Sequence, residues 1–262
     1  MNQELKNRWD RNRLRDPHGV EDKKQRVRTM FAQVAGTYDL VNHVLSLNQD
    51  HRWRKRAVSR VRPMPGQAIL DVCCGTGDMA LTFAIVEPKL NKVVGVDFVA
   101  PMLDIARRKG RRLLDERSQQ NHNGLTFQWH CADAEDIPLD DGRFDRISCV
   151  FGIRNLQNPR QGLREMFRLL KPGGRVVILE FAMPENPVIR WLYQCYFRLA
   201  LPVLGTLISQ DKTGAYQYLP QSVRAFDTRP LLESGLRQAG FGAVEVCPLN
   251  FGSVLLVTAL KP

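Results

Sequence analysis

The segment Asp71-Val72-Cys73-Cys74-Gly75-Thr76-Gly77 combines a carboxylate, a hydroxyl and two closely spaced glycines. It follows the apolar run Ala68–Val72 and precedes a stretch that we expect to be helical, so it forms the turn between a strand and a helix. Glycines in such a turn let the backbone approach a ligand closely, and the free N–H groups at the start of a helix bind a carboxylate or a phosphate. The candidate ligand-binding residues here are Asp71, Gly75, Thr76 and Gly77.

Asp97 supplies a second carboxylate, 20 residues after Gly77 and at the end of another apolar run. A carboxylate in this position can accept hydrogen bonds from both hydroxyls of a ribose. The spacing of Gly75, Gly77 and Ala80 also satisfies the dinucleotide fingerprint, in which alanine is allowed at the third position. The pattern indicates an adenosine-containing ligand and leaves NAD and S-adenosylmethionine open. The alternative is that Asp97 only caps the helix that Pro101 begins.

The segment Cys131–Pro138 follows a third apolar run and supplies two further candidates. The carboxylate of Asp133 can accept a hydrogen bond from an adenine amino group, and the N–H of Ala134 can donate to a ring nitrogen. We therefore expect Asp133 and Ala134 to bind the base of the same ligand.

Strands that alternate with helices are needed to position these residues, and the hydropathy pattern predicts them. The expected strands lie at 68–72, 92–97, 125–130, 144–150 and 175–180, with two late strands at about 241–247 and 253–259. The expected helices lie at 23–34, 40–47, 53–61, 78–87, from 101 onward, at 160–170 and at 229–239. This order predicts an α/β fold with a doubly wound parallel sheet.

Composition places the chain among ordinary globular proteins. It has 262 residues, 44% of them hydrophobic, which suits one large domain and excludes a disordered tail or a disulfide-stapled scaffold. The six cysteines show no C-x-x-C spacing, so we expect no zinc site and reduced thiols. No secretory signal is visible, and the apolar stretch Leu199–Ile208 is shorter than the ~20 residues that span a bilayer. We expect a cytoplasmic protein.

The charge is strongly basic, at +11, and bears on partners rather than on the fold. Nine basic residues precede position 30, and a second cluster lies at 107–112. Nucleic acid, an anionic membrane surface, an acidic substrate and plain solvated helix faces all remain open on charge alone. We expect residues 1–22, which are polar and charged, to form a mobile basic arm.

The series of Asp71–Gly77, Asp97, Asp133-Ala134 and Leu170–Gly174 resembles the class I methyltransferase pattern. That resemblance implies S-adenosylmethionine as the ligand. It also implies a Rossmann-like, seven-stranded sheet whose last strand is antiparallel, which the two late strands would complete.

Flanking segments resemble one family more closely, the ubiquinone/menaquinone biosynthesis C-methyltransferases. The most diagnostic block is Phe151-Gly152-Ile153-Arg154-Asn155, and the resemblance covers about 23–260. Asn48 and His51 depart from the usual glycine and arginine. The other matching segments are Val27–Asn42, Leu45–Arg54, Leu179–Phe181 and Tyr218–Val223.

The family resemblance implies methylation of a ring carbon on a reduced polyprenyl quinone, a demethylmenaquinol or a methoxy-polyprenyl-benzoquinol. It places Arg154 and Asn155 at the quinol, Arg154 to stabilise a phenolate and Asn155 to orient the second oxygen. Tyr38 would close over the ligand, and the alternative is that it only packs the N-terminal helices together. Arg154 is too basic to accept a proton, so the general base stays unassigned. The alternative for Arg154 is a structural ion pair with Asp71, Asp145 or Glu180.

The remaining segments are assigned by their place around this core. Residues 23–262 form one domain, with N-terminal helices at 23–62 and a helical lid at 184–226 that covers the acceptor through an apolar tunnel or touches a membrane. We expect no nucleic acid partner and no metal, and we leave a homodimer open. The alternative interpretations are a methyltransferase of a sterol or phenolic acceptor, an RNA methyltransferase, and a non-enzymatic lipid-binding or scaffold protein.

Overall fold

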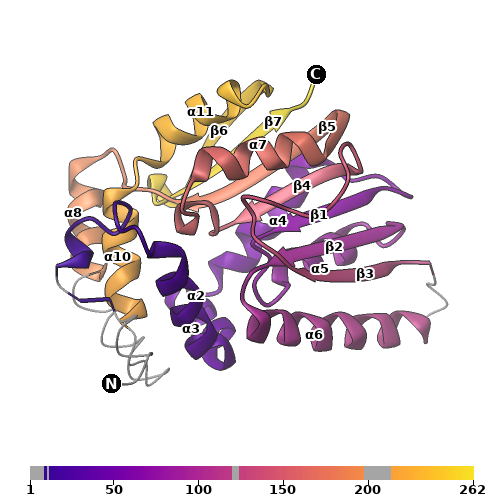
Figure 1. Cartoon of the computed structure of the whole chain (residues 1–262), viewed down its shortest axis with the longest axis horizontal. Coiled ribbons are helices and arrows are strands. Elements are labelled where there is room, and N and C mark those ends of the chain that lie inside the picture. Colours follow the sequence, from indigo (N-terminus) through magenta and orange to yellow (C-terminus); the bar gives the residue numbers. More distant parts are fainter. Residues whose placement is uncertain (1–8, 11, 120–123, 198–213) are drawn as a thin grey trace.

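The computed structural model describes residues 9–10, 12–119, 124–197 and 214–262, and its centre is one seven-stranded sheet (Figure 1). The strand order is β3-β2-β1-β4-β5-β7-β6, with parallel pairing from β3 to β5. β7 runs antiparallel to both neighbours. The strands are β1 (Ala68–Val72), β2 (Lys92–Asp97), β3 (Thr126–Cys131), β4 (Phe144–Val150), β5 (Leu170–Phe181), β6 (Gly242–Leu249) and β7 (Val254–Leu260). The predicted doubly wound sheet with an antiparallel last strand is confirmed.

Helices cover both faces of the sheet, because successive residues of its central strands point to opposite faces. In β5, Val176 and Ile178 join the core under α7 and α11, whereas Val177 and Leu179 join the core under α4 and α5. Figure 1 shows α7 and α11 in front of the sheet and α4 and α5 behind it. The helices are α2 (Lys23–Val34), α3 (Tyr38–Leu45), α4 (Gln49–Val61), α5 (Asp78–Val86), α6 (Ala100–Ser118), α7 (Pro159–Leu169), α8 (Pro187–Cys195), α10 (Ala215–Ala225) and α11 (Thr228–Gln238).

Strand β5 is longer than the predicted 175–180. Leu170 pairs with Phe144 and Arg175 pairs with Arg146, so the four residues between Leu170 and Arg175 bulge out of the ladder. Gly173 in this bulge has a φ of 74°, the left-handed conformation expected of a turn. The predicted Lys171–Gly174 turn is therefore present, inside the strand rather than before it.

The part of the predicted mobile arm (1–22) that the structure describes packs against α10. The Trp9 ring is buried and lies 4.4 Å from the Tyr218 ring of α10, centroid to centroid. The Nε2 atom of His18 lies 2.8 Å from the carbonyl oxygen of Ser222, also in α10. Aromatic burial of this kind offsets the entropy of ordering the segment. Residues 1–8 and 11 lie outside the described residues.

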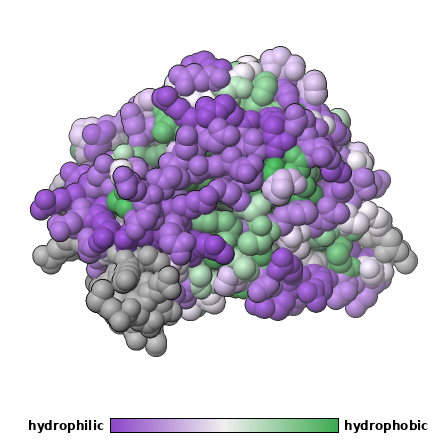
Figure 2. Space-filling view, in the orientation of Figure 1, coloured by the Kyte–Doolittle hydropathy of each residue, from purple (hydrophilic) through white to green (hydrophobic). Residues whose placement is uncertain are grey.

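The predicted lid at 184–226 contains α8 and α10, which stand beside the N-terminal helices at one end of the sheet (Figure 1). The apolar stretch at 199–208 lies outside the described residues. Within the described part of the chain, no helix is long and apolar enough to cross a membrane. Figure 2 shows that the face in view is largely hydrophilic, with a pale green apolar area between α2–α3 and the sheet.

Candidate active site

The carboxyl ends of β1, β2, β3 and β4 meet at one edge of the sheet, and nearly all predicted site residues follow these ends. Parallel sheets of this type bind ligands at that edge. Two adjoining cavities lie there, which we call together the edge cavity; Cys73, Asp97, Phe98, Asn155 and Leu156 line both parts.

The glycine turn after β1 has the backbone that its sequence predicts. Gly75 and Gly77 adopt φ values of 53° and 88°, which glycine reaches without steric cost. A Cβ atom on Gly77 would also lie 3.0 Å from the side chains of Ala106 and Trp129. The Gly75 N–H donates to Asp97 Oδ2 at 2.8 Å, so the turn and the end of β2 are held together.

Asp97 has the geometry expected of a ribose acceptor. It is 9% exposed and lines both parts of the edge cavity. Its Oδ1 accepts the Val99 N–H at 2.9 Å, and each carboxylate oxygen keeps a second lone pair for a ligand hydroxyl. Burial raises the pKa of Asp97 to about 6, so the carboxylate is charged at neutral pH.

Asp133 and Ala134 lie beyond β3, on the far side of Asp97 from the glycine turn, and line the edge cavity. Asp133 Oδ1 accepts the Glu135 N–H at 3.0 Å, and its other oxygen pairs with the ammonium of Lys24 from α2. Because β2 lies between β1 and β3, the acceptor carboxylates of Asp97 and Asp133 stand in the order in which a ribose and an adenine amino group would meet them. The Lys24 contact is one that sequence reasoning missed.

Two predicted ligand residues have other partners in the structure. Asp71 is fully buried and accepts hydrogen bonds from the Ser148 hydroxyl at 2.7 Å and the Ala80 N–H at 3.2 Å. Burial raises its pKa to about 7. Asp71 therefore holds the start of α5 against β4, beneath the turn. The Thr76 hydroxyl donates to Asp39 Oδ1 at 2.5 Å.

A second, larger cavity of about 550 Å³ lies between the N-terminal helices, α10 and the ends of β4 and β5. We call it the aromatic pocket. It adjoins the edge cavity, because Phe31, Tyr38 and Phe151 line both. Other residues of its wall are Trp53, Arg154, Phe181, Tyr193, Tyr216 and Tyr218.

Arg154 lies in this wall and forms a buried ion pair. Its NH1 group lies 2.5 Å from Glu180 Oε1 and donates to the Phe151 carbonyl at 2.9 Å. The Arg154 side chain is 5% exposed and that of Glu180 is fully buried. The guanidinium also lies 5.4 Å from the centre of the Phe181 ring. The ion pair with Glu180, which the sequence analysis gave as an alternative role for Arg154, is therefore present. Arg154 also lines the aromatic pocket.

Tyr38 and Asn155 occupy different positions. Tyr38 stands between the two cavities, and burial raises the pKa of its hydroxyl. Asn155 lines the edge cavity rather than the aromatic pocket, and its amide is engaged on both sides. Its Oδ1 accepts from the Tyr218 hydroxyl at 3.0 Å, and its Nδ2 donates to the Phe151 carbonyl at 3.2 Å.

Lys23 is a further residue that sequence reasoning missed. Its ammonium is buried and donates to the carbonyl groups of Arg154, at 2.9 Å, and Leu156. Burial lowers its pKa to about 8. Lys23 therefore fixes the 154–156 backbone from α2. The burial of Lys23 could not be predicted from the sequence, because a lysine in a helix rich in basic residues is expected to be solvated.

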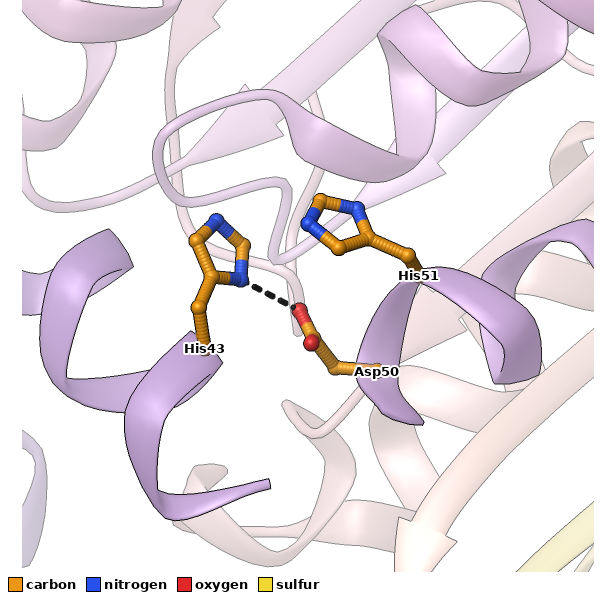
Figure 3. A group of neighbouring side chains, drawn as sticks. All are labelled: His43, Asp50 and His51. Carbon is orange, nitrogen blue, oxygen red and sulfur yellow. Dashed lines mark hydrogen bonds and ion pairs between the residues drawn. The ribbon is translucent and has the colours of Figure 1, made fainter. Parts of the chain in front are cut away.

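One group among the described residues has the spacing of metal ligands, namely His43, Asp50 and His51. Figure 3 shows the His43 ring turned toward Asp50, with a distance of 2.8 Å from Nδ1 to Oδ2, and the His51 ring beside it. Asp50 already pairs with Arg54 and accepts from the Ser46 hydroxyl. A carboxylate with these three partners is neutralised without a metal ion.

Comparison with known proteins confirms the family that the sequence motifs predict. Residues 19–261 match the model of the ubiE/COQ5 methyltransferase family. The chain is 40% identical over 245 residues to a protein of Geobacter sp. (strain M21) named ubiquinone/menaquinone biosynthesis C-methyltransferase, covering 93% of this chain and 100% of the relative. It is 41% identical over 233 residues to the demethylmenaquinone methyltransferase of Thermus thermophilus, covering 89% and 100%.

Solved structures confirm the fold at lower identity. An S-adenosylmethionine-dependent methyltransferase from Thermotoga maritima matches with a TM-score of 0.57 and 19% identity, over 90% of this chain and all of that chain. A Haemonchus contortus phosphoethanolamine N-methyltransferase in complex with S-adenosylhomocysteine matches with a TM-score of 0.58 and 17% identity, over 80% and 52%. The family match and the curated relatives span most of the chain, and the protein therefore belongs to the ubiE/COQ5 methyltransferase family.

Proposed function

We propose that this protein transfers a methyl group from S-adenosylmethionine to a ring carbon of a reduced polyprenyl quinone. The observation that carries the proposal is the junction of the two cavities. The edge cavity, whose lining includes the carboxylates of Asp97 and Asp133, adjoins an aromatic pocket of about 550 Å³, and Tyr38 and Phe151 line both. A flat, apolar ring in the aromatic pocket would lie next to the end of the edge cavity. The names of the family and of the relatives support the same reaction.

The edge cavity would hold the donor through this chain's own groups. Asp97 would accept from the ribose hydroxyls, Asp133 from the adenine amino group, and the Ala134 N–H would donate to the base. Gly75 and Gly77 keep the turn open to the methionine end of the donor. When bound, the donor supplies a methyl group already activated by the positive sulfur. Holding the reacting atoms in line can lower the barrier by ~7–11 kcal/mol.

The aromatic pocket would hold and activate the quinol. Loss of a phenolic proton to solvent raises the electron density on the adjacent ring carbon. This carbon forms the new C–C bond with the methyl group as the methyl–sulfur bond breaks and S-adenosylhomocysteine is released. The carbon then loses its own proton to solvent, which restores the aromatic ring. Arg154 stays charged throughout and stabilises the phenolate by a charge-assisted hydrogen bond, directly or through water. Tyr38 keeps its proton at neutral pH and excludes water between the cavities. Asn155 orients Tyr218 in the pocket wall.

We also propose a peripheral contact with a membrane, since a polyprenyl substrate partitions into the lipid bilayer. Two exposed apolar stripes flank the aromatic pocket, one of Leu40, Val44 and Leu47 at α3 and one of Val188, Trp191 and Leu192 on α8. Apolar side chains of this kind insert into the boundary of a bilayer, and the basic charge of the chain favours anionic lipid head groups.

The test is a transfer assay with purified protein, methyl-labelled S-adenosylmethionine and a panel of reduced demethylated quinones, read by mass spectrometry. The expected product is a quinol heavier by one labelled methyl group on carbon. Sterols, simple phenols and RNA serve as competing acceptors in parallel reactions. Transfer to one of these and not to any quinol would overturn the proposal.

A further inference from the structure

Five charged side chains form a continuous ion-pair network between the N-terminal helices and the start of α5. We call Asp39, Asp50, Arg54, Asp78 and Lys109 the entry network. The Arg54 guanidinium pairs with Asp50 and lies 3.4 Å from Asp78 Oδ2. The Lys109 ammonium lies 2.5 Å from Asp78 Oδ1 and 2.8 Å from Asp39 Oδ2. The network therefore joins α3, α4, α5 and α6 through side chains alone.

One end of the entry network holds the glycine turn of the edge cavity. Thr76, between the two glycines of that turn, donates from its hydroxyl to Asp39 Oδ1 at 2.5 Å. Its carbonyl accepts from Lys109 Nζ at 3.3 Å. Asp78 is the first residue of α5, directly after Gly77. A ligand that fixes the turn therefore also fixes Asp39, Asp78 and Lys109.

The other end lies in the wall of the aromatic pocket. Asp50 and Arg54 both line that pocket, and Asp39 directly follows Tyr38, which lines both cavities. The Arg54 and Asp50 side chains are 7% and 3% exposed, so solvent screens their pairing little. A movement of Asp39 would therefore displace its chain neighbour Tyr38, and a movement of Asp78 would displace the Arg54 guanidinium at the pocket wall.

The charges of the network make its members interdependent. Three carboxylates share two cations, and each cation contacts two carboxylates. The His43 imidazole adds a hydrogen bond to Asp50 and stacks on His51, with ring centroids 4.3 Å apart (Figure 3). Loss of one cation would leave two carboxylates facing each other, so the pairs respond as a unit rather than one by one.

We propose that the entry network couples the two cavities, with Lys109, Asp39 and Arg54 as positioning residues that make donor binding and acceptor binding mutually favourable. The inference rests on the proposed function, because it takes a sulfonium donor and a quinone as the two ligands. Binding of either ligand raises the affinity for the other by the same factor. We expect a factor of about ten, which lies within the usual range for coupled sites.

The test uses two unreactive probes, S-adenosylhomocysteine for the edge cavity and an oxidised short-chain demethylquinone for the aromatic pocket. Calorimetry gives the quinone Kd with and without saturating S-adenosylhomocysteine. In the wild type, S-adenosylhomocysteine should lower the quinone Kd about tenfold. In Lys109→Met this ratio should fall below about twofold, and Lys109→Arg, which keeps the cation, should recover most of it. Lys89→Met, the same change at an exposed position outside the network, should keep the full ratio.

Asp39→Asn gives a second route if Lys109→Met does not fold. It keeps the shape of the side chain and an acceptor for the Thr76 hydroxyl but removes the charge that faces Lys109, so it should also lower the ratio. The inference is overturned if S-adenosylhomocysteine changes the quinone Kd of the wild type by less than twofold. It is also overturned if Lys109→Met or Asp39→Asn folds and keeps the same ratio as the wild type. Failure of the proposed function would look different, because then one probe would not bind at all or no quinol would be methylated.

Discussion

The buried pair of Arg154 and Glu180 gives the sharpest test of the proposed chemistry, because it separates stability from catalysis. Arg154→Met removes the only cation that contacts Glu180 among the described residues. The side chains are 5% and 0% exposed, so the variant strands a carboxylate in the core. Breaking such a pair costs ~3–5 kcal/mol of unfolding free energy, out of about 5–15 kcal/mol for a typical domain.

Adding Glu180→Gln to Arg154→Met removes the stranded charge, and the double variant should regain most of the lost stability in urea unfolding. It should not regain activity, because the phenolate would still lack its cation. Removing one such stabilising donor typically lowers kcat by ~10²–10³-fold. We therefore expect the single variant to be destabilised and the double variant to be nearly as stable as the wild type, with the same low rate of methyl transfer in both.

Affinity for S-adenosylhomocysteine is the internal control, since neither Arg154 nor Glu180 itself lines the edge cavity. If the double variant recovered wild-type turnover together with stability, Arg154 would act only as a structural ion-pair partner. If Arg154→Met alone kept wild-type turnover, the phenolate role would also be refuted.

Three other predictions concern the edge cavity. Asp97→Ala should abolish binding of S-adenosylhomocysteine in calorimetry. In the wild type, the affinity for S-adenosylhomocysteine should fall as the pH drops through about 6, because Asp97 then takes up a proton. An affinity that does not change between pH 5 and pH 8 would contradict this role of Asp97. Gly77→Ala should destabilise the protein by ~1–3 kcal/mol in urea unfolding, because the residue has a φ of 88° and little room for a Cβ atom; a neutral effect would show that the turn can shift. Lys24→Met should tighten S-adenosylhomocysteine binding by up to about fivefold, because the partly exposed pair with Asp133 must otherwise be displaced; weaker binding would mean that Lys24 helps to hold the ligand.

Local patterns predicted the central fold closely. The bounds of β1, β2 and β4 match the predicted 68–72, 92–97 and 144–150, because each is a short apolar run closed by polar or turn residues. The packing of the N-terminal arm was not predicted, because burial of Trp9 depends on Tyr218, more than 200 residues away. A composition rule for a polar segment cannot detect one buried aromatic anchor.

The site divides in the same way. The placement of Gly75, Gly77, Asp97 and Asp133 at one edge of the sheet could be predicted, because each lies at or within a few residues of a strand end and the fold brings these ends together. Asp71 belongs to the same motif, yet it holds α5 from below, since only the pleat of β1 decides which way its side chain points. The entry network was not predicted, because its members come from four separate helices.

The excess of basic residues near the N-terminus shows why charge counts need a structure. Lys23 donates to backbone carbonyls beside Arg154, Lys24 pairs with Asp133, and Arg26 pairs with Asp22. Three of the nine basic residues before position 30 are thus used inside the fold, two of them at the candidate site. Their charge contributes to the +11 but is not free to attract a nucleic acid or a membrane. An anionic partner, where one binds, must be recognised by basic side chains other than these three, and charge reversal at exposed basic residues would test this.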